Sequence, residues 1–415
     1  MDKVTYSSEQ VSRFAGLHHD TDSGLRSIGA FAVLNFITYV DFTADWGFMK
    51  TRAYPLLRHV ADFYQSYARW NETAGWFDIP HSCAQEQCFA QGGADTAGNV
   101  RVSNNPPYDV GLAKHVLRRL VTWSDRLDRD ASDRSKWRHM LEHLAPWELT
   151  VDDQNRSVFA QASLAGHPSG GFPSRAGPHK GSFNARYPIV YFAGIFPGEE
   201  IGPDSDLDTL EIAQRTVESV NSFNEWSPTN GMCMAWPPAT RSLLHNASFL
   251  LEKFERAVNL TALPNFFPDI SNHPDSGSGC PFENAGALLA INELFVMSAN
   301  FTLRFFPLGW PKGERAAFSN LRGKGAFLTS GEAVGGEFVG AVRIHSEAGG
   351  DCVFMPPRFI AAPHTKEKPP GTGVAGVRVT EASSGTSVPL SILPRTGGKL
   401  RFATRAGLAY LLSAV

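Results

Sequence analysis

The chain has 415 residues, with 38 lysines and arginines against 41 aspartates and glutamates and a formal net charge of −3. This length allows two or three domains around a large core. The nearly balanced charge argues against nucleic acid or an anionic membrane surface as a partner. No apolar run approaches the roughly 20 residues of a membrane-spanning helix, so we expect no membrane insertion.

The cysteines and the N-glycosylation sequons give information on the cellular compartment of the protein. Five scattered cysteines form neither a disulfide scaffold nor a zinc-ligand spacing, and we expect no metal and no other cofactor. The first ten residues lack the apolar region of a signal peptide. The glycosylation sequons nevertheless indicate a secretory route, which would mean that upstream sequence is absent; a cytoplasmic location is the alternative. The sequons lie at Asn71, Asn155, Asn246, Asn259 and Asn300.

Helical periodicity covers much of the first 300 residues. Apolar residues recur at helical spacing from 25 to 39, and after Asp45-Trp46-Gly47 a second helix is expected from 48 to 67, with a kink at Pro55. Asn104-Asn105-Pro106-Pro107 opens another helix. Further helices are expected at 135–144, 207–220, 231–244, 246–258 and in the second half of 263–297. Short helices joined by turns predict αα-hairpins.

Three polar segments are candidates for a site. Glu86 lies in an aperiodic loop, 76–93, with few charged neighbours, and partial burial there would raise its pKa, as a general acid requires. Asp109 falls in the first turn of a helix, where a carboxylate also simply complements the helix dipole. The run 16–22 contains His19 and Asp22, but its spacing does not favour a metal site.

The stretch from 263 to 297 combines a polar loop with an apolar helix. Prolines and glycines up to Pro281 exclude a helix in its first half, whereas Leu288, Ile291 and Leu294 have helical spacing. Long loops in compact domains are usually functional or disordered, and flanking phenylalanines argue against disorder. The loop is expected to carry Asn265, Asp269, His273, Asp275 and Glu283.

After residue 300 the pattern changes to short alternating runs separated by glycine and proline, which is typical of an antiparallel β-sandwich. The expected strands are 338–345, 352–355, 377–380, 390–393, 400–404 and 408–412.

These segments resemble glycoside hydrolase family 95, the six-hairpin fucosidases and galactosidases. The resemblance is clearest in Pro264-Asn265-Phe266-Phe267, then Asn284 and Gly286, then Ile291-Asn292-Glu293-Leu294. It implies a mainly α fold: an (α/α)6 barrel, incomplete at its N-terminal end, over residues 1–302. A small antiparallel β-sandwich would follow over 303–415.

The resemblance also implies a function, the inverting hydrolysis of a terminal fucose- or galactose-type sugar from an oligosaccharide or glycoconjugate glycan. Glu86 matches the family's acid loop, but Phe282 stands where the family has its catalytic aspartate, so Glu283 is the candidate base. The expected substrate-binding residues are His19, Asp22, Asp109, Asn265 and Asn284. Two alternatives stay open: a catalytically inactive sugar-binding remnant, and a phosphorylase that would use the segment 179–182.

Overall fold

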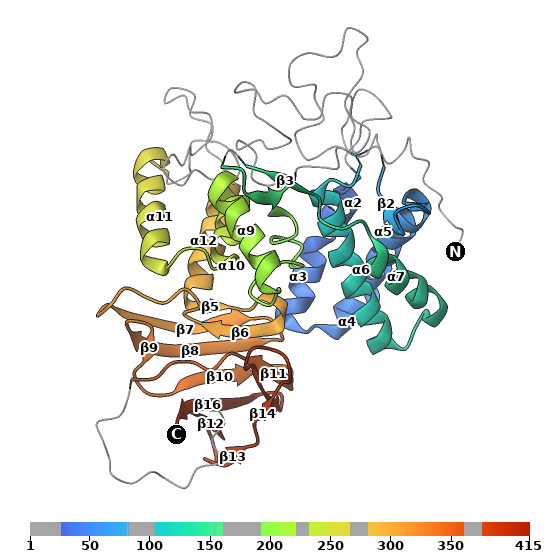
Figure 1. Ribbon diagram of the computed structural model, residues 1–415. Coiled ribbons are helices and arrows are strands. Elements are labelled where there is room, and N and C mark those ends of the chain that lie inside the picture. Colours follow the sequence, from blue (N-terminus) through green and yellow to red (C-terminus); the bar gives the residue numbers. More distant parts are fainter. Residues whose placement is uncertain are drawn as a thin grey trace. The chain divides into compact units, whose positions relative to one another are not determined.

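The computed structural model describes residues 26–80, 82, 104–152, 154–160, 192–220, 232–265, 281–360 and 376–415 (Figure 1). The chain divides into two compact units. The first comprises residues 1–37, 47–201 and 205–225, and the second comprises residues 38–46, 202–204 and 226–415. Among the helices that can be described, none has the length and apolar character needed to span a bilayer.

The first unit is mainly helical, and each of its two short antiparallel sheets is a pair of three-residue strands. Amphipathic sequences form its longer helices, which bury one face and expose the other. The helices that lie in it or lead into it are α2 (Ile28–Ala32), α3 (Leu34–Thr43), α4 (Trp46–Phe48), α5 (Tyr54–Tyr67), α6 (Pro107–Leu127), α7 (Ala131–His143) and α9 (Leu207–Val220). The strand pairs are β1 (Arg69–Asn71) with β2 (Trp76–Asp78), and β3 (Leu149–Val151) with β4 (Ser157–Phe159).

The predicted kink at Pro55 is wrong, because Pro55 lies in the first turn of a helix. The predicted helix over 48–67 consists of a π-helical turn, Met49–Ala53, followed by α5. Proline lacks the N–H that an interior helical position donates, whereas the first turn has no use for that donor. The irregularity therefore precedes the proline. Similarly, the predicted helix over 25–39 is divided between α2 and α3 at Val33.

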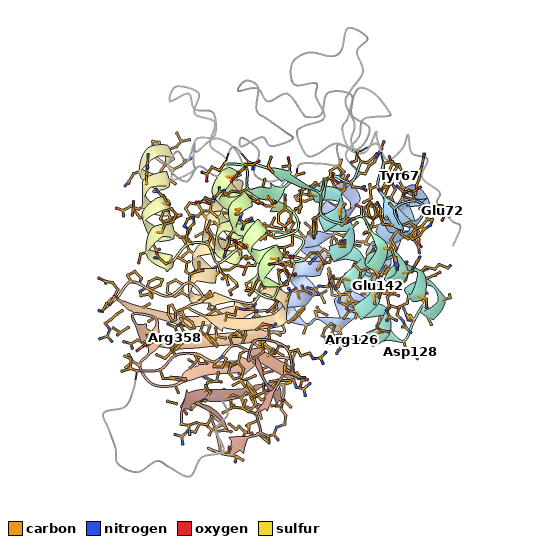
Figure 2. All side chains as sticks on the ribbon, viewed as in Figure 1. Tyr67, Glu72, Arg126, Asp128, Glu142 and Arg358 are labelled. Atoms are coloured by element: carbon orange, nitrogen blue, oxygen red, sulfur yellow. The ribbon has the colours of Figure 1, made fainter. Side chains whose placement is uncertain are left out.

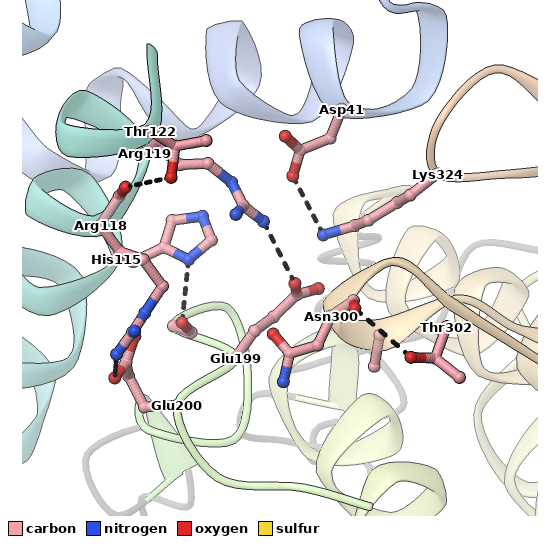
Figure 3. Close-up of polar contacts among 12 residues, drawn as sticks. Asp41, His115, Arg118, Arg119, Thr122, Glu199, Glu200, Asn300, Thr302 and Lys324 are labelled. Atoms are coloured by element: carbon pink, nitrogen blue, oxygen red, sulfur yellow. Dashed lines mark hydrogen bonds and ion pairs between the residues drawn. The ribbon is translucent and has the colours of Figure 1, made fainter. Parts of the chain in front are cut away.

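Helix α6 anchors the first unit. Pro107 opens it, and Asp128 ends it in the left-handed conformation, after which α7 packs back against it. Its side chains also hold the segment 192–201: the His115 Nδ1–H donates to the Gly198 carbonyl at 2.8 Å, and Arg118 Nε donates to Glu200 at 2.9 Å (Figure 3). These contacts join α6 to a segment about 80 residues away in sequence.

The backbones of α6 and this segment touch because both contribute glycines. A Cβ atom on Gly111 would lie 2.9 Å from the Ala193 carbonyl oxygen of that segment. One on Gly198 would lie 2.4 Å from the same oxygen, within its own segment, and 3.1 Å from the Gly111 carbonyl oxygen of α6. Real Cβ atoms do not come within 3.0 Å of another heavy atom, so a side chain at Gly111 must push the segment away from α6, and one at Gly198 must distort the segment itself.

We expect Gly198→Ala to lower the free energy of unfolding by about 1–3 kcal/mol, the usual cost of overpacking a tight interior. Urea unfolding followed by circular dichroism measures it. The control is Gly29→Ala in α2, where the new Cβ would meet only Val60 Cγ2 at 3.8 Å. An alanine in that helix should be neutral or stabilising by up to about 1 kcal/mol. Equal stability of the two variants would contradict the close approach.

The second unit contains three helices and two larger sheets. Its helices are α10 (Met232–Arg241), α11 (Ala247–Thr261) and α12 (Pro281–Phe295). Asn246 caps α11 by accepting a hydrogen bond from the Phe249 N–H at 2.9 Å. The predicted helix over 231–244 is present as α10, and it continues through Pro237 and Pro238.

Glu283 was predicted to belong to the polar loop, and this is wrong: its backbone lies in the first turn of α12. Pro281 begins this helix, because proline is compatible with a first turn although not with a helix interior.

The two sheets share one apolar core. The larger has seven strands in the order β13-β12-β16-β10-β8-β7, with β9 paired to β8; the smaller has the order β14-β15-β11-β6-β5. Alternating burial points Ile344 and Phe402, among others, into the common core. The strands are β5 (Val296–Met297), β6 (Thr302–Phe305), β7 (Arg315–Gly323), β8 (Phe327–Val334), β9 (Glu337–Phe338), β10 (Val342–Ser346), β11 (Gly350–Phe354), β12 (Val377–Glu381), β13 (Ser387–Val388), β14 (Ser391–Ile392), β15 (Leu400–Thr404) and β16 (Leu408–Ala414).

The strands differ from expectation in three ways. The hairpin of β7 and β8 was not predicted, and the strand expected over 338–345 is two strands, β9 and β10. The sheets are also not wholly antiparallel, because β6 runs parallel to β11, with Thr302 opposite Val353. A helical part and a β part are thus present, as predicted, while the boundary between 302 and 303 stays a prediction.

Candidate active site

Most side chains of the predicted site lie outside the described residues. This holds for the candidate acid and two candidate sugar ligands, namely Glu86, His19 and Asp22. Glu283 and Asn284 have their backbone in the first turn of α12, but their side chains are outside the description. Asp109 and Asn265 can be described, and they belong to different units. That the predicted acid, base and sugar-binding residues form one site therefore stays a prediction.

Asn265 lies in a turn beyond the end of α11 and is exposed.

Asp109, in contrast, lies in a helix and is buried. It occupies the first turn of α6, as predicted, but its side chain is completely buried. Neither of its carboxylate oxygens has a hydrogen-bond partner in the described part of the chain. A buried charge normally has a partner, because desolvation is costly.

The other buried acids confirm this contrast. Within the described residues, the four other buried carboxylates each face a cation. Their nearest N–O distances are 3.1 Å for Asp41 with Lys324, 2.8 Å for Asp152 with Arg156, 3.8 Å for Glu199 with Arg119 and 2.6 Å for Glu293 with Arg241 (Figure 3 draws the first and third). Asp109 has no such ion pair, so its ionisation is opposed by its surroundings.

Burial raises the pKa of Asp109 from 3.8 to about 7. The hydroxyls of Ser82 and Ser27 and the charge of Arg26 lower this pKa in part, without forming a hydrogen bond of good geometry or an ion pair with the carboxylate. Near neutral pH the group is thus poised between a neutral acid that donates a proton and an anion that accepts one. Such a carboxyl is typical of a functional site.

The groups around Asp109 come from separate elements that meet here. The Arg26 N–H donates to Ser82 Oγ at 3.3 Å, and Tyr64 Oη on α5 donates to the Arg26 carbonyl at 3.3 Å. Burial, and next the nearby charge of Asp109, raise the pKa of Tyr64 well above 10. The guanidinium of Arg26 lies 4.9 Å from the ring of Tyr67, which is labelled on α5 in Figure 2.

Asn105 fixes the strand β2 to the start of α6. Its side-chain oxygen accepts from the Ile79 N–H and its amide donates to Asp78, both at 2.7 Å. Its own N–H donates to the Ile79 carbonyl at 2.9 Å. Asn105 adopts the left-handed conformation, which asparagine tolerates better than most residues. These contacts hold the segment that leads to Ser82 beside the first turn of α6.

The raised pKa predicts how stability depends on pH. The pKa is higher in the folded chain than in the unfolded chain, so the folded state loses stability as pH rises from about 4 to about 7. A difference of about three units corresponds to at most about 4 kcal/mol. We expect Asp109→Asn, which cannot ionise, to gain stability relative to the parent protein over this range. Urea unfolding at pH 4, 5.5, 7 and 8 measures the difference.

The control for this prediction is Asp62→Asn, which removes an exposed carboxyl from α5. Its difference from the parent protein should change much less with pH than that of Asp109→Asn. If the two variants give the same pH profile, the carboxyl of Asp109 does not carry the raised pKa.

No group of three or more histidine, cysteine, aspartate or glutamate side chains in the described ranges could hold a metal ion. The sequence pointed to Asp109 through its helical position and the family resemblance. It did not point to Ser27 or Asn105, because serine and asparagine next to helix ends ordinarily serve as caps, nor to Ser82, which lies in a segment without helical or strand periodicity. The Asn-Asn-Pro-Pro run was the one signal for Asn105.

Comparison with known proteins agrees with this location. Residues 5–165 match the glycosyl hydrolase family 95 catalytic domain, a segment that contains Asp109 and its neighbours. The resemblance to family 95 is confirmed. The match includes Glu86, His19 and Asp22, whereas Asn265, Glu283 and Asn284 lie beyond it. No curated protein matches the chain.

Two solved structures are similar to the chain at low identity. One is a putative kojibiose phosphorylase from human microbiome, with 13% identity and a TM-score of 0.44, covering 79% of this chain and 47% of that one. The other is an α-L-rhamnosidase of Streptomyces avermitilis complexed with L-rhamnose, with 11% identity and a TM-score of 0.41, covering 93% and 32%. This chain thus spans about half and about a third of their lengths.

Proposed function

We propose that the chain hydrolyses a glycosidic bond with inversion, releasing a terminal fucose- or galactose-type sugar from an oligosaccharide or a glycoconjugate glycan. The observation that carries this proposal is the match of residues 5–165 to a glycosidase catalytic domain. Asp109 supports it, because the one buried carboxyl without a cation, among those described, falls within that segment. An (α/α)6 barrel is the fold that we propose for the helical part.

Inverting hydrolysis requires an acid that protonates the leaving oxygen and a base that activates water, about 6.5–9.5 Å apart. We assign the acid role to Glu86 and the base role to Glu283.

The remaining predicted residues would bind the sugar. His19, Asp22, Asn265 and Asn284 offer the hydrogen-bonding groups that sugar hydroxyls need. Asp109 has no exposed surface in this structure. Direct contact with a sugar would require the residues that cover Asp109 to move.

The alternative is a catalytically inactive sugar-binding protein. It is favoured by Phe282, which stands where the family has its catalytic aspartate, and by the position of Glu283 beyond the matched residues. Both proposals predict sugar binding, but only the first predicts turnover. A secretory location stays a prediction, supported by the sequons alone.

The test is an assay with 4-nitrophenyl α-L-fucoside and the corresponding galactosides, followed by proton NMR of the first sugar released. Inverted anomeric configuration supports the proposed hydrolase, and retention contradicts it. Where no substrate turns over, titration with L-fucose and D-galactose by calorimetry distinguishes the alternatives. Saturable binding without turnover supports the binding protein, and neither binding nor turnover refutes both. A dependence of turnover on phosphate would instead indicate a phosphorylase.

A further inference from the structure

Two histidines form a pair on the surface of α7. His139 and His143 are four residues apart, so they project from the same side of the helix. Their ring centroids are 4.3 Å apart. His139 is exposed and His143 is half-buried, while the opposite side of α7 buries Trp137 and Met140.

The hydrogen bond of His143 selects the tautomer of its neutral ring. Nδ1–H donates to the carbonyl oxygen of His139 at 2.8 Å, so Nε2 is the nitrogen whose lone pair can bind a metal ion. Metal-binding histidines usually have this arrangement, with the second ring nitrogen donating to a carbonyl or a carboxylate. The hydrogen bond therefore prepares His143 as a ligand.

Aromatic residues from the β1–β2 pair hold the two rings in place. The Trp70 ring lies 5.9 Å from that of His139 and 6.0 Å from that of His143. Phe77 contacts His139 edge-on at 5.7 Å, and its carbonyl accepts from the Ala145 N–H at 3.1 Å, just beyond the end of α7. The side chains are thus ordered before any ligand arrives, which lowers the entropic cost of binding.

We propose that His139 and His143 together chelate one divalent transition-metal ion, of the copper(II) or zinc(II) class. Neutral imidazole suits these ions. A bond length of about 2.0–2.1 Å means that two nitrogens up to about 4 Å apart can share one ion. The spacing is the one that helical zinc-binding motifs use. Glu142 lies on the same helix (Figure 2), but it does not form a three-residue metal-binding group with the two histidines.

The site would be open rather than closed. In the part of the chain that the structure describes, no third histidine, cysteine, aspartate or glutamate completes the set. Water would fill the remaining coordination positions, so the affinity should be moderate, and copper(II) should bind more tightly than zinc(II). The inference is independent of the glycosidase proposal, because it involves none of the residues assigned to catalysis or sugar binding.

The test is calorimetric titration of the tag-free full chain with copper(II) and zinc(II) ions. His139→Ala and His143→Ala should each weaken one class of sites at least tenfold, and the double variant should remove it. The matched control is His59→Ala, which removes an exposed histidine from α5 and leaves the pair intact. Its titration should equal that of the parent protein.

Two spectroscopic measurements test the site independently of the heat of binding. Electron paramagnetic resonance of one bound copper(II) should show two nitrogen ligands in the parent protein and one or none in the single variants. Copper(II) should also quench the fluorescence of Trp70, and Trp70→Phe should abolish that part of the quenching. Circular dichroism verifies that the variants fold. Titrations and spectra of the double variant that equal those of the parent protein would overturn the proposal.

Discussion

Replacing Glu86 by glutamine is expected to slow the hydrolysis of an unactivated glycoside by about 10²–10⁴-fold, the usual contribution of a general acid. Glutamine has nearly the same shape but cannot donate the proton that the leaving oxygen needs. A 4-nitrophenyl glycoside, whose leaving group is already a weak base, should lose much less. The measurement is kcat/KM for a natural oligosaccharide and for the aryl glycoside, with both proteins at one pH.

The control for this prediction is Glu72→Gln. Glu72 is exposed next to β1 and is labelled in Figure 2, so its replacement changes the charge of the same unit by the same amount. Neither substrate should respond to it. An equal loss on both substrates with Glu86→Gln would argue for a role other than proton donation, and unchanged activity would remove Glu86 from the mechanism.

Replacing Glu293 by alanine is expected to lower the free energy of unfolding by about 3–5 kcal/mol, because it removes the carboxylate of a buried ion pair. Glu293 on α12 accepts from Arg241 Nη2 at 2.6 Å and Nε at 2.9 Å, and from the Thr240 hydroxyl at 2.8 Å. Glu293 and Arg241 are about 5% exposed or less. Urea unfolding followed by tryptophan fluorescence measures the loss.

Two variants sharpen this test. Glu332→Ala breaks an exposed ion pair with Arg315 in the same unit, and exposed pairs contribute only about 0–1 kcal/mol. The double substitution Glu293→Leu with Arg241→Met removes both buried charges, and it should cost less than Glu293→Ala alone. If the double substitution lowers the free energy of unfolding by as much as Glu293→Leu and Arg241→Met added together, the two charges do not interact.

Helices were predicted well where apolar periodicity alone determines them. The segment 207–220 is helical over the predicted range, since its apolar residues keep their spacing without glycine or proline. The hairpin of β7 and β8 was missed for a physical reason. A bulge between Phe318 and Leu321 shifts the register of β7, so its burial does not alternate regularly. The sequence signal that remained for this hairpin was Gly325, a glycine at the turn, where φ is +85°.

The site was predictable only in part. The position of Asp109 follows from a proline-opened helix, but its burial without an ion pair does not, and the two serines that moderate its pKa, Ser27 and Ser82, come from distant parts of the chain. Likewise, the family resemblance drew attention to Glu293, whose partner Arg241 lies 52 residues earlier. Burial and pairing arise from tertiary packing, and local periodicity does not encode them. A carboxylate in a first turn looks the same in sequence whether it is exposed, paired or alone.

The parallel pairing of β6 with β11 determines where the chain can be divided. β6 lies between β11 and β5 in the smaller sheet, and Val296 and Leu303 both belong to the core shared by the sheets. A fragment starting at residue 303 would lack β5 and the first residue of β6. The rest of β6 would then present unpaired backbone groups along the side that β5 covers, a template for intermolecular strand addition, and its pairing with β11 would lose the Thr302–Val353 pair. Recombinant expression of the β part as a separate, soluble fragment therefore calls for a start before Val296.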